Sequence, residues 1–148
     1  MKLTNGFDIS SSALTAQRFR MDVISSNIAN ADSTRARMVD GKWTPYQRKL
    51  VTVEPKHAGF EQALQNAQAG TAGEGVQVTR VIEDTSPFKQ VYNPTHPDSD
   101  ENGFVMMPNV DVLKEMVDMI SATRSYEANV TALNASKSLI SKALEIGR

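Results

Sequence analysis

Residues 112–146 read VLKEMVDMISATRSYEANVTALNASKSLISKALEI, and this stretch decides the fold. Its apolar positions recur in alternating steps of four and three, which is the spacing of a coiled-coil seam. We therefore predict one long helix with a packing stripe along its length. The stripe contains Met116, Met119, Thr123, Tyr126, Val130, Leu133, Lys137, Ile140 and Leu144.

Both ends of this helix carry capping signals. Asn109 is expected to cap the N-terminus, Asp111 suits the positive end of the helix dipole, and Gly147 can end the helix. Such a helix is about 57 Å long, whereas a compact chain of this size would be only about 38 Å across. We expect the helix to extend beyond a small core and to pack against partners. On periodicity alone, the alternative is a helix that covers its own domain's core.

A second amphipathic segment lies near the N-terminus and keeps the same rhythm. Short polar side chains crowd residues 25–34 and compete for backbone hydrogen bonds, so this helix should end near Asn30 to Asp32. Pairing of the first helix with the last, followed by packing against neighbouring subunits, would satisfy both stripes. The first stripe contains Phe7, Ser10, Leu14, Gln17, Met21, Ile24 and Ile28.

The middle of the chain has a different character. Residues 35–107 hold five of the six prolines and six of the eight glycines. Residues 60–67 have helical spacing and predict a short helix or a loop, within a variable segment near 55–75. Runs of β-forming residues predict strands at Tyr46–Glu54, Gly75–Glu83, Phe88–Tyr92 and Phe104–Met107.

The predicted fold class is α+β. Two long terminal helices form a coiled-coil-like α domain, and a small β-rich domain lies between them in the sequence. The predicted divisions are 1–34 for the N-terminal helix, 35–107 for the β-rich middle and 108–148 for the C-terminal helix.

Composition excludes several classes of protein. The net charge is −1, and no segment has the basic footprint of a nucleic-acid binder. The N-terminus lacks the apolar core of a signal peptide, and no run approaches the roughly 20 apolar residues of a membrane span. The chain has no cysteine, which excludes disulfides and thiolate metal sites. We expect neither general secretion nor membrane insertion.

One turn resembles part of a metal site. Residues 98–103, DSDENG, fit the first half of an EF-hand calcium loop, but Asn109 stands where that loop needs a bidentate glutamate. His57 and His96 are too few for a zinc site without cysteines. Without a catalytic constellation we expect no enzyme, cofactor, metal or small-molecule substrate. The alternative function is a small soluble binding module with a weak calcium-sensitive loop at 98–103.

Two terminal motifs resemble a known family. Residues 26–32, SNIANAD, resemble the Asn-Ile-Ala-Asn signature of bacterial flagellar axial proteins. The C-terminal part is similar to proximal-rod members of that family. The chain departs from many relatives at 34–37, where TRAR replaces their Thr-x-Gly-Tyr. The C-terminal similarity lies in Gly103–Asn109, Glu115–Val117, Arg124–Asn129 and Ala143–Gly147.

The resemblance implies a structural subunit of the proximal rod of the flagellar basal body. Such subunits are exported through the flagellar type III apparatus without a cleaved signal peptide, and their terminal helices fold on assembly. They form a periplasmic drive shaft that surrounds the export channel and transmits torque.

The partners implied are other copies of the chain, other rod proteins, the rod-base adaptor, membrane-ring components and the export apparatus. Asn27 and Tyr126 are expected to make specific contacts. The expected assembly interface contains Leu14, Met21, Ile24, Asn27, Ile28, Asn30, Met116, Met119, Tyr126, Val130, Leu133, Ile140 and Leu144.

Overall fold

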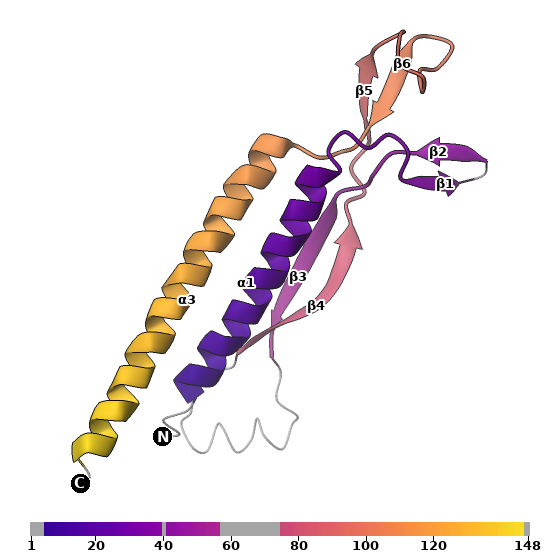
Figure 1. Ribbon diagram of the computed structural model, residues 1–148. Helices are drawn as coiled ribbons and strands as arrows, with labels where there is room; N and C mark the ends of the chain where they lie inside the picture. Colours follow the sequence, from indigo (N-terminus) through magenta and orange to yellow (C-terminus); the bar gives the residue numbers. More distant parts are fainter. Residues whose placement is uncertain (1–4, 40, 57–74, 147–148) are drawn as a thin grey trace. The chain divides into compact units, whose positions relative to one another are not determined.

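A computed structural model describes residues 5–39, 41–56 and 75–146 of the chain (Figure 1). Helices come first and last, and short strand pairs lie between them in the sequence, which confirms the predicted α+β class. The described elements are α1 (Asn5–Ala29), β1 (Arg37–Val39), β2 (Lys42–Thr44), β3 (Lys49–Pro55), β4 (Val76–Glu83), β5 (Lys89–Tyr92), β6 (Phe104–Met107) and α3 (Val112–Ile146).

The chain divides into two compact units, each assembled from segments that are far apart in the sequence. The predicted divisions at 1–34, 35–107 and 108–148 follow changes in sequence character and stay a prediction. The first unit contains Met1–Met21, Thr52–Arg80 and Ser121–Arg148, and the second contains Asp22–Val51 and Val81–Ile120.

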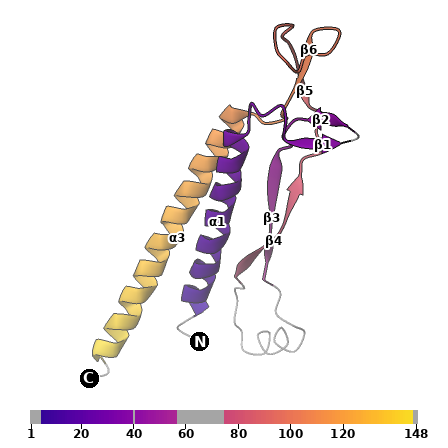
Figure 2. The same cartoon turned by 45° about the vertical axis from the view of Figure 1, so that its right-hand side comes forward.

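In the first unit α1 packs against α3 in an antiparallel arrangement, as both views show (Figures 1 and 2). The Thr123 hydroxyl donates to the Met21 sulfur at 3.6 Å. Towards the other end of α1, a Cβ placed on Gly6 would lie 3.8 Å from the Ser136 hydroxyl oxygen. Ala16 and Ala122 are buried, and small side chains of this kind let two helix backbones approach closely.

The start of β4 is held against α1 in the same unit. The Ser12 hydroxyl donates to the carbonyl of Ile9 at 2.7 Å and accepts from the backbone N–H of Val76 at 3.1 Å. A Cβ added to Gly75 would lie 2.5 Å from the Ser12 hydroxyl oxygen. A side chain at position 75 would therefore force Ser12 or the strand to shift, because the strand passes so close to the helix.

Strands β3 and β4 form an antiparallel two-stranded sheet. Backbone hydrogen bonds from Asp84 to Arg48 and from Lys56 to Gly75 mark its two ends, at 2.8 Å and 2.7 Å. The strand predicted at 46–54 begins three residues later than expected, because Tyr46 and Arg48 belong to the polar network described below. The predicted strands at 75–83, 88–92 and 104–107 are confirmed.

The second unit carries two further antiparallel hairpins. The β1–β2 hairpin pairs Met38 with Trp43, and it was not predicted because each strand has only three residues. The β5–β6 hairpin pairs Tyr92 with Phe104. Gly41 and Gly103 have φ of 78° and 77°, the left-handed conformation that glycine adopts without strain. The apolar core of this unit consists of Ile24, Tyr46, Val105 and Val110.

Helix ends agree with the sequence except at one cap. Helix α1 ends at Ala29, close to the predicted boundary, and α3 has the predicted bounds. The prediction that Asn109 caps α3 is wrong. Asp111 is the cap, because its carboxylate accepts from the backbone N–H groups of Leu113 and Lys114 at 3.1 Å and 3.5 Å. Gly147, His57 and the predicted segment 60–67 lie outside the described residues.

Candidate assembly interface

The centre of the second unit is the side chain of Asn27, which is only 1% exposed. Its amide nitrogen donates to the Lys49 carbonyl at 2.9 Å and to the Glu115 carboxylate at 3.0 Å. Its amide oxygen accepts from the Lys49 N–H and from the Tyr46 hydroxyl, both at 3.0 Å. All four hydrogen-bonding positions of the amide are occupied, so this burial leaves no orphaned polar group.

Glu115 links this amide to a cation. Its second carboxylate oxygen accepts from Arg48 Nε at 2.6 Å, and the Glu115 side chain is 1% exposed. The Arg48 guanidinium also approaches Asp84 at 3.6 Å and Asp118 at 3.5 Å. A buried carboxylate is tolerable only when charge and hydrogen bonds compensate its lost hydration, and Arg48 with Asn27 supply both. We call Asn27, Tyr46, Arg48 and Glu115 the polar hub.

The hub accounts for the Asn-Ile-Ala-Asn signature. Asn27 lies in the last turns of α1 and points into the hub, while Asn30 follows the helix. The Asn30 amide donates to the Ser26 carbonyl at 2.8 Å, and its oxygen accepts from the Ser33 hydroxyl at 3.3 Å. One asparagine therefore joins α1 to distant segments, and the other adds a second, side-chain hydrogen bond to a carbonyl in the last turn of the helix that also accepts from the Asn30 backbone N–H at 3.2 Å.

Asn109 is not a member of the polar hub, but it forms hydrogen bonds with the segments around Arg48 and Asp84. Its side-chain oxygen accepts from the Arg48 N–H at 2.8 Å, and its amide donates to the Asp84 and Ser86 carbonyls, each at 3.1 Å. Hydrogen bonds from the Ser86 hydroxyl and backbone N–H, with the Arg48 charge nearby, lower the pKa of Asp84 below its ordinary value. Asp84 therefore carries its negative charge beside Arg48 at neutral pH.

The loop that resembles half of a calcium site is held by protein groups. Asp98 accepts from Arg35 Nε at 2.7 Å and from the Thr34 hydroxyl at 2.8 Å. These two hydrogen bonds and the Arg35 charge lower the pKa of Asp98. The backbone N–H of Asp98 donates to His96 Nδ1 at 3.1 Å. Within the described residues, no group of three or more acidic or histidine side chains is placed to hold a metal ion.

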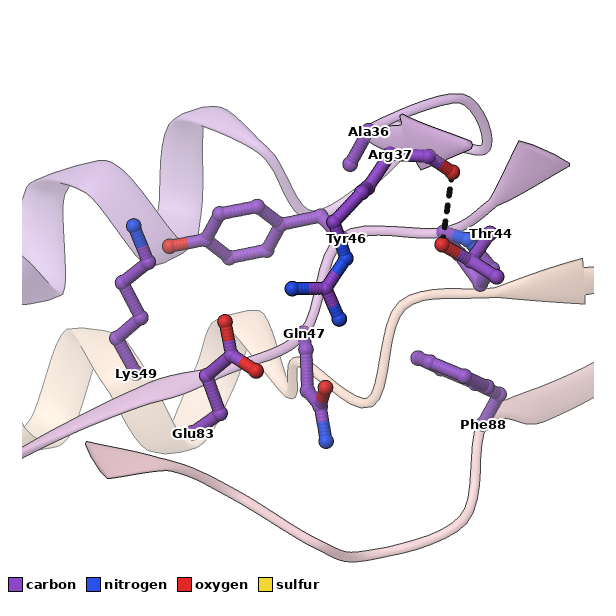
Figure 3. Close-up of a pocket in the computed structure, with 9 residues that line it drawn as sticks. Ala36, Arg37, Thr44, Tyr46, Gln47, Lys49, Glu83 and Phe88 are labelled. Carbon is purple, nitrogen blue, oxygen red and sulfur yellow. Dashed lines mark hydrogen bonds between the residues drawn. The ribbon is translucent and has the colours of Figure 1, made fainter. Parts of the chain in front are cut away.

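A pocket of about 290 Å³ lies beside the hub, lined by charged and aromatic side chains (Figure 3). Arg37, Lys49 and Glu83 line it, and the Lys49 ammonium lies 5.7 Å from the centroid of the Tyr46 ring. The Thr44 hydroxyl donates to the Arg37 carbonyl at 2.8 Å. The lining offers charges and an aromatic face, which suit a polar contact.

The structure separates the residues of the expected interface by exposure. Ile24 and Asn27 are buried within the second unit, and Met116 and Leu144 are 50% and 72% exposed. The others are partly buried, namely Leu14, Met21, Ile28, Asn30, Met119, Tyr126, Val130, Leu133 and Ile140.

A second stripe on α3 was missed by the sequence analysis. Leu113, Val117 and Leu139 are 76%, 66% and 71% exposed, and Ile120 is also exposed. Leu113, Val117 and Ile120 keep the four-three spacing beside the traced seam, so following a second register from residue 112 would have found them; Leu139 lies outside that register, further along the exposed side of the helix. Large apolar side chains that water reaches on one helix are typical of an interaction surface.

No helix in the described part of the chain combines the length and apolar character needed to cross a membrane. The features that remain are a buried polar hub, two long helices and an uncovered apolar stripe.

Comparison with known proteins places the chain among flagellar axial proteins. Residues 7–37 match the family model for flagella basal body rod proteins, and residues 101–146 match the model for the C-terminal region of flagellar basal body rod FlgEFG proteins. Both matched regions contain hub residues, Asn27 in the first and Glu115 in the second.

Relatives that match over the full length of the chain identify a particular family within this class. The chain is 55% identical to the flagellar basal-body rod protein FlgC of Bacillus subtilis over the whole of both chains. It is 47% identical to the FlgC protein of an Escherichia coli O6:H1 strain, again over both whole chains, and 43% identical to that of Borreliella burgdorferi over 99% of this chain and 98% of the relative. The chain belongs to the FlgC family of structural flagellar basal-body rod proteins.

Proposed function

We propose that this chain is a subunit of the proximal rod and that it packs against its neighbours through α1 and α3. The uncovered stripe on α3 is the observation that carries this proposal. Leu113, Val117 and Leu139 are each at least 66% exposed, and covering such side chains gives a favourable free energy of roughly 25 cal/mol for each Å² removed from water. A neighbouring subunit is the natural cover in a protein of the rod family.

The proposed interface combines two sets of residues. The first is the expected interface, in which Met116 and Leu144 remain exposed, Ile24 and Asn27 are buried and the others are partly covered. The second is the added stripe with Leu113, Val117 and Leu139. In this proposal Asn27 acts from within the subunit, because its hydrogen bonds hold the segments that present both helices.

Further parts of the role are inferred from the family. We propose that the subunit reaches the periplasm through the flagellar type III export apparatus and surrounds the export channel. Its partners would be other copies, other rod proteins, the rod-base adaptor and membrane-ring components. Its work would be mechanical, transmitting torque without catalysis. The alternative of a calcium-sensitive module is weaker, because Arg35 already neutralises Asp98.

Electron microscopy of basal bodies tests this proposal. Cells that lack the gene should have no rod beyond the membrane ring, and the full-length chain should restore it. Intact rods in the deletion strain would overturn the proposal.

A pair of charged variants then tests the apolar stripe. Leu139→Asp should leave the helix content of the purified chain unchanged but prevent rod formation, because it places a charge in the covered interface. Ser138→Asp is the control, since it adds the same charge one residue away at an exposed position that is already polar. Normal rods with Leu139→Asp would exclude Leu139 from the interface.

A further inference from the structure

The β5–β6 hairpin has one apolar face that water reaches. The strand register places Tyr92 opposite Phe104, and two residues further along it places Gln90 opposite Met106. Opposed residues and every second residue of a strand share one face, so these four side chains lie on the same side. Tyr92, Phe104 and Met106 are 66%, 42% and 41% exposed, whereas Val105 on the other face is buried. We call the side with Tyr92, Phe104 and Met106 the outer face.

The free edge of β5 carries backbone groups without a partner. The Asn93 N–H donates to the Gly103 carbonyl at 2.9 Å, which continues the register as a hydrogen-bonded pair. Hydrogen-bonded and non-hydrogen-bonded pairs alternate along an antiparallel ladder, so the N–H and C=O groups of Gln90 and Tyr92 point away from β6. The sheet has two strands in the described part of the chain, and none of these four groups has a hydrogen bond there.

The edge of β6 is already covered at one end. The Phe104 carbonyl, which points away from β5, accepts from the Asp100 N–H at 2.8 Å. The edge of β5 is therefore the more open of the two. A strand that adds there must be short, because Pro87 and Pro94, two residues beyond either end of β5, have no N–H to donate.

The turn between β5 and β6 adds negative charge at the tip of the hairpin. Asp100 and Glu101 are exposed, and neither side chain has an ion pair or hydrogen bond within the described residues. Asp98 differs, because Arg35 neutralises it. The backbone bond from Asp100 to Phe104 places the free carboxylates at the same end of the hairpin as the aromatic pair.

We infer that the edge of β5 binds an extended segment of another basal-body protein, which adds to the hairpin as a third strand. The inference rests on the proposed function and names one of its contacts. The backbone of the segment supplies the hydrogen bonds that Gln90 and Tyr92 lack, and its apolar side chains at alternate positions cover the outer face. A lysine or arginine next to them faces Asp100 and Glu101, which gives the complementary charge.

Two other occupants fit the edge less well. The backbone groups of a helix are already paired within the helix, so a helix would leave Gln90 and Tyr92 unsatisfied. Pairing with β5 of a second copy is two-fold symmetric and closes after two subunits. It also brings no free cation to the acidic turn, because the Lys89 ammonium donates to the Val110 carbonyl at 2.7 Å.

A proline in β5 tests the edge. Gln90→Pro removes one outward N–H and places a ring on the edge, while the hydrogen bonds between β5 and β6 remain. In cells that carry only this variant we expect roughly tenfold fewer rods, with the melting temperature of the purified chain unchanged. Gln90→Ala is the matched control and should give normal rods, since it changes the same side chain but keeps the N–H. Normal rods with Gln90→Pro would overturn the inference.

Photocross-linking identifies the occupant, whatever the proline does to the hairpin. Benzoylphenylalanine is incorporated at position 92 in cells, isolated basal bodies are irradiated, and the cross-linked peptide is sequenced. We expect a segment of another basal-body protein with apolar residues at alternate positions and a lysine or arginine beside them. The same group at position 131, exposed on α3, should not capture that peptide. A cross-link to a second copy, to a segment without this pattern, or to nothing would overturn the inference.

Charge reversal tests the acidic turn separately. Glu101→Lys should reduce the number of rods, whereas Asp32→Lys, which makes the same change at another exposed turn of the same unit, should not. Equal numbers of rods from the two variants would contradict a basic partner. All these failures leave the proposed function intact, because rods still form. Intact rods in the deletion strain would overturn both.

Discussion

The Asn27 amide donates a 3.0 Å hydrogen bond to the Glu115 carboxylate, and it thereby joins the end of α1 to the first turn of α3. These residues are 88 positions apart in the chain. Arg48 donates to the other carboxylate oxygen, so three segments that are far apart in the sequence meet at the buried Glu115 side chain. The hub therefore holds the end of α1 and the start of α3 together within the second unit.

Replacing the Asn27 amide by a carboxylate should lower the free energy of unfolding of the second unit. Asn27→Asp replaces a donor by an acceptor, so the Lys49 carbonyl loses its partner and the Glu115 carboxylate faces a like charge. Each buried group left without a partner costs about 1–3 kcal/mol, and more where charge is involved. Urea denaturation should show this loss, whereas Asn134→Asp, at an exposed position, should change the free energy of unfolding little.

A double variant tests whether the Asn27 and Glu115 side chains are energetically coupled. Glu115→Gln combined with Asn27→Asp removes the like-charge repulsion and should recover part of the lost stability. With Glu115→Gln alone as the fourth member of the cycle, a loss in the double variant equal to the sum of the two single losses would show that the two side chains are not coupled.

Removing the hub's cation should cost more than removing the whole charge pair. Arg48→Met leaves Glu115 charged and 1% exposed, and an uncompensated buried charge costs about 3–5 kcal/mol. Adding Glu115→Gln removes that charge and should recover much of the loss. Arg124→Met, at an exposed position on α3, is the control and should have almost no effect on the denaturation midpoint.

The stability of the fold should decrease at acidic pH, because Asp98 and Asp84 become protonated there. Both pKa values are lower in the folded protein than the ordinary 3.8, so the folded state binds protons less readily than the unfolded chain. Their contribution is present above pH 3.8 and is lost as the pH falls from there through the lowered pKa values. Asp98→Asn should flatten the melting temperature against pH in this range. Glu101→Gln should leave the profile unchanged, and identical profiles for both variants would exclude the Arg35–Asp98 pair as its source.

A methyl group at position 75 should separate β4 from α1. In Gly75→Ala the new Cβ would meet the Ser12 hydroxyl oxygen at 2.5 Å, so helix and strand must move apart. Overpacking of this kind costs about 1–3 kcal/mol. Thermal unfolding measures the effect, and Gly41→Ala separates it from backbone strain, because Gly41 has a positive φ but open space around it. No loss for Gly75→Ala would show that the contact yields easily.

The helices could be predicted because their signals are local and periodic. The rhythm over 112–146 and the polar run after Ile28 decide both boundaries within each segment. Strand β6 was predicted at its observed bounds for a similar reason, since turn-forming residues end before Phe104. The cap of α3 was misassigned because Asn109 and Asp111 are both good caps, and tertiary hydrogen bonds to Arg48 and Asp84 decide between them.

The hub could not be predicted in full because its partners are far apart in the sequence. Asn27 stands out through its signature, but nothing near Arg48 or Glu115 indicates that they meet. A charged residue just before a β-forming run and a glutamate in the first turn of a helix usually face water. The exposed Leu113 and Leu139 were overlooked for another reason, because one stripe on α3 had already explained its periodicity.

The 88-residue separation of Asn27 and Glu115 also sets an order of events in time. While the ribosome makes the chain, α1 emerges long before the residue that completes its buried contact. Until then Asn27, Tyr46 and Arg48 have nothing to enclose them, and closing so long a loop is slow compared with forming a helix. The polar hub therefore closes only after the segment that carries Glu115 is available, and until then the end of α1 lacks the partner that its buried amide requires.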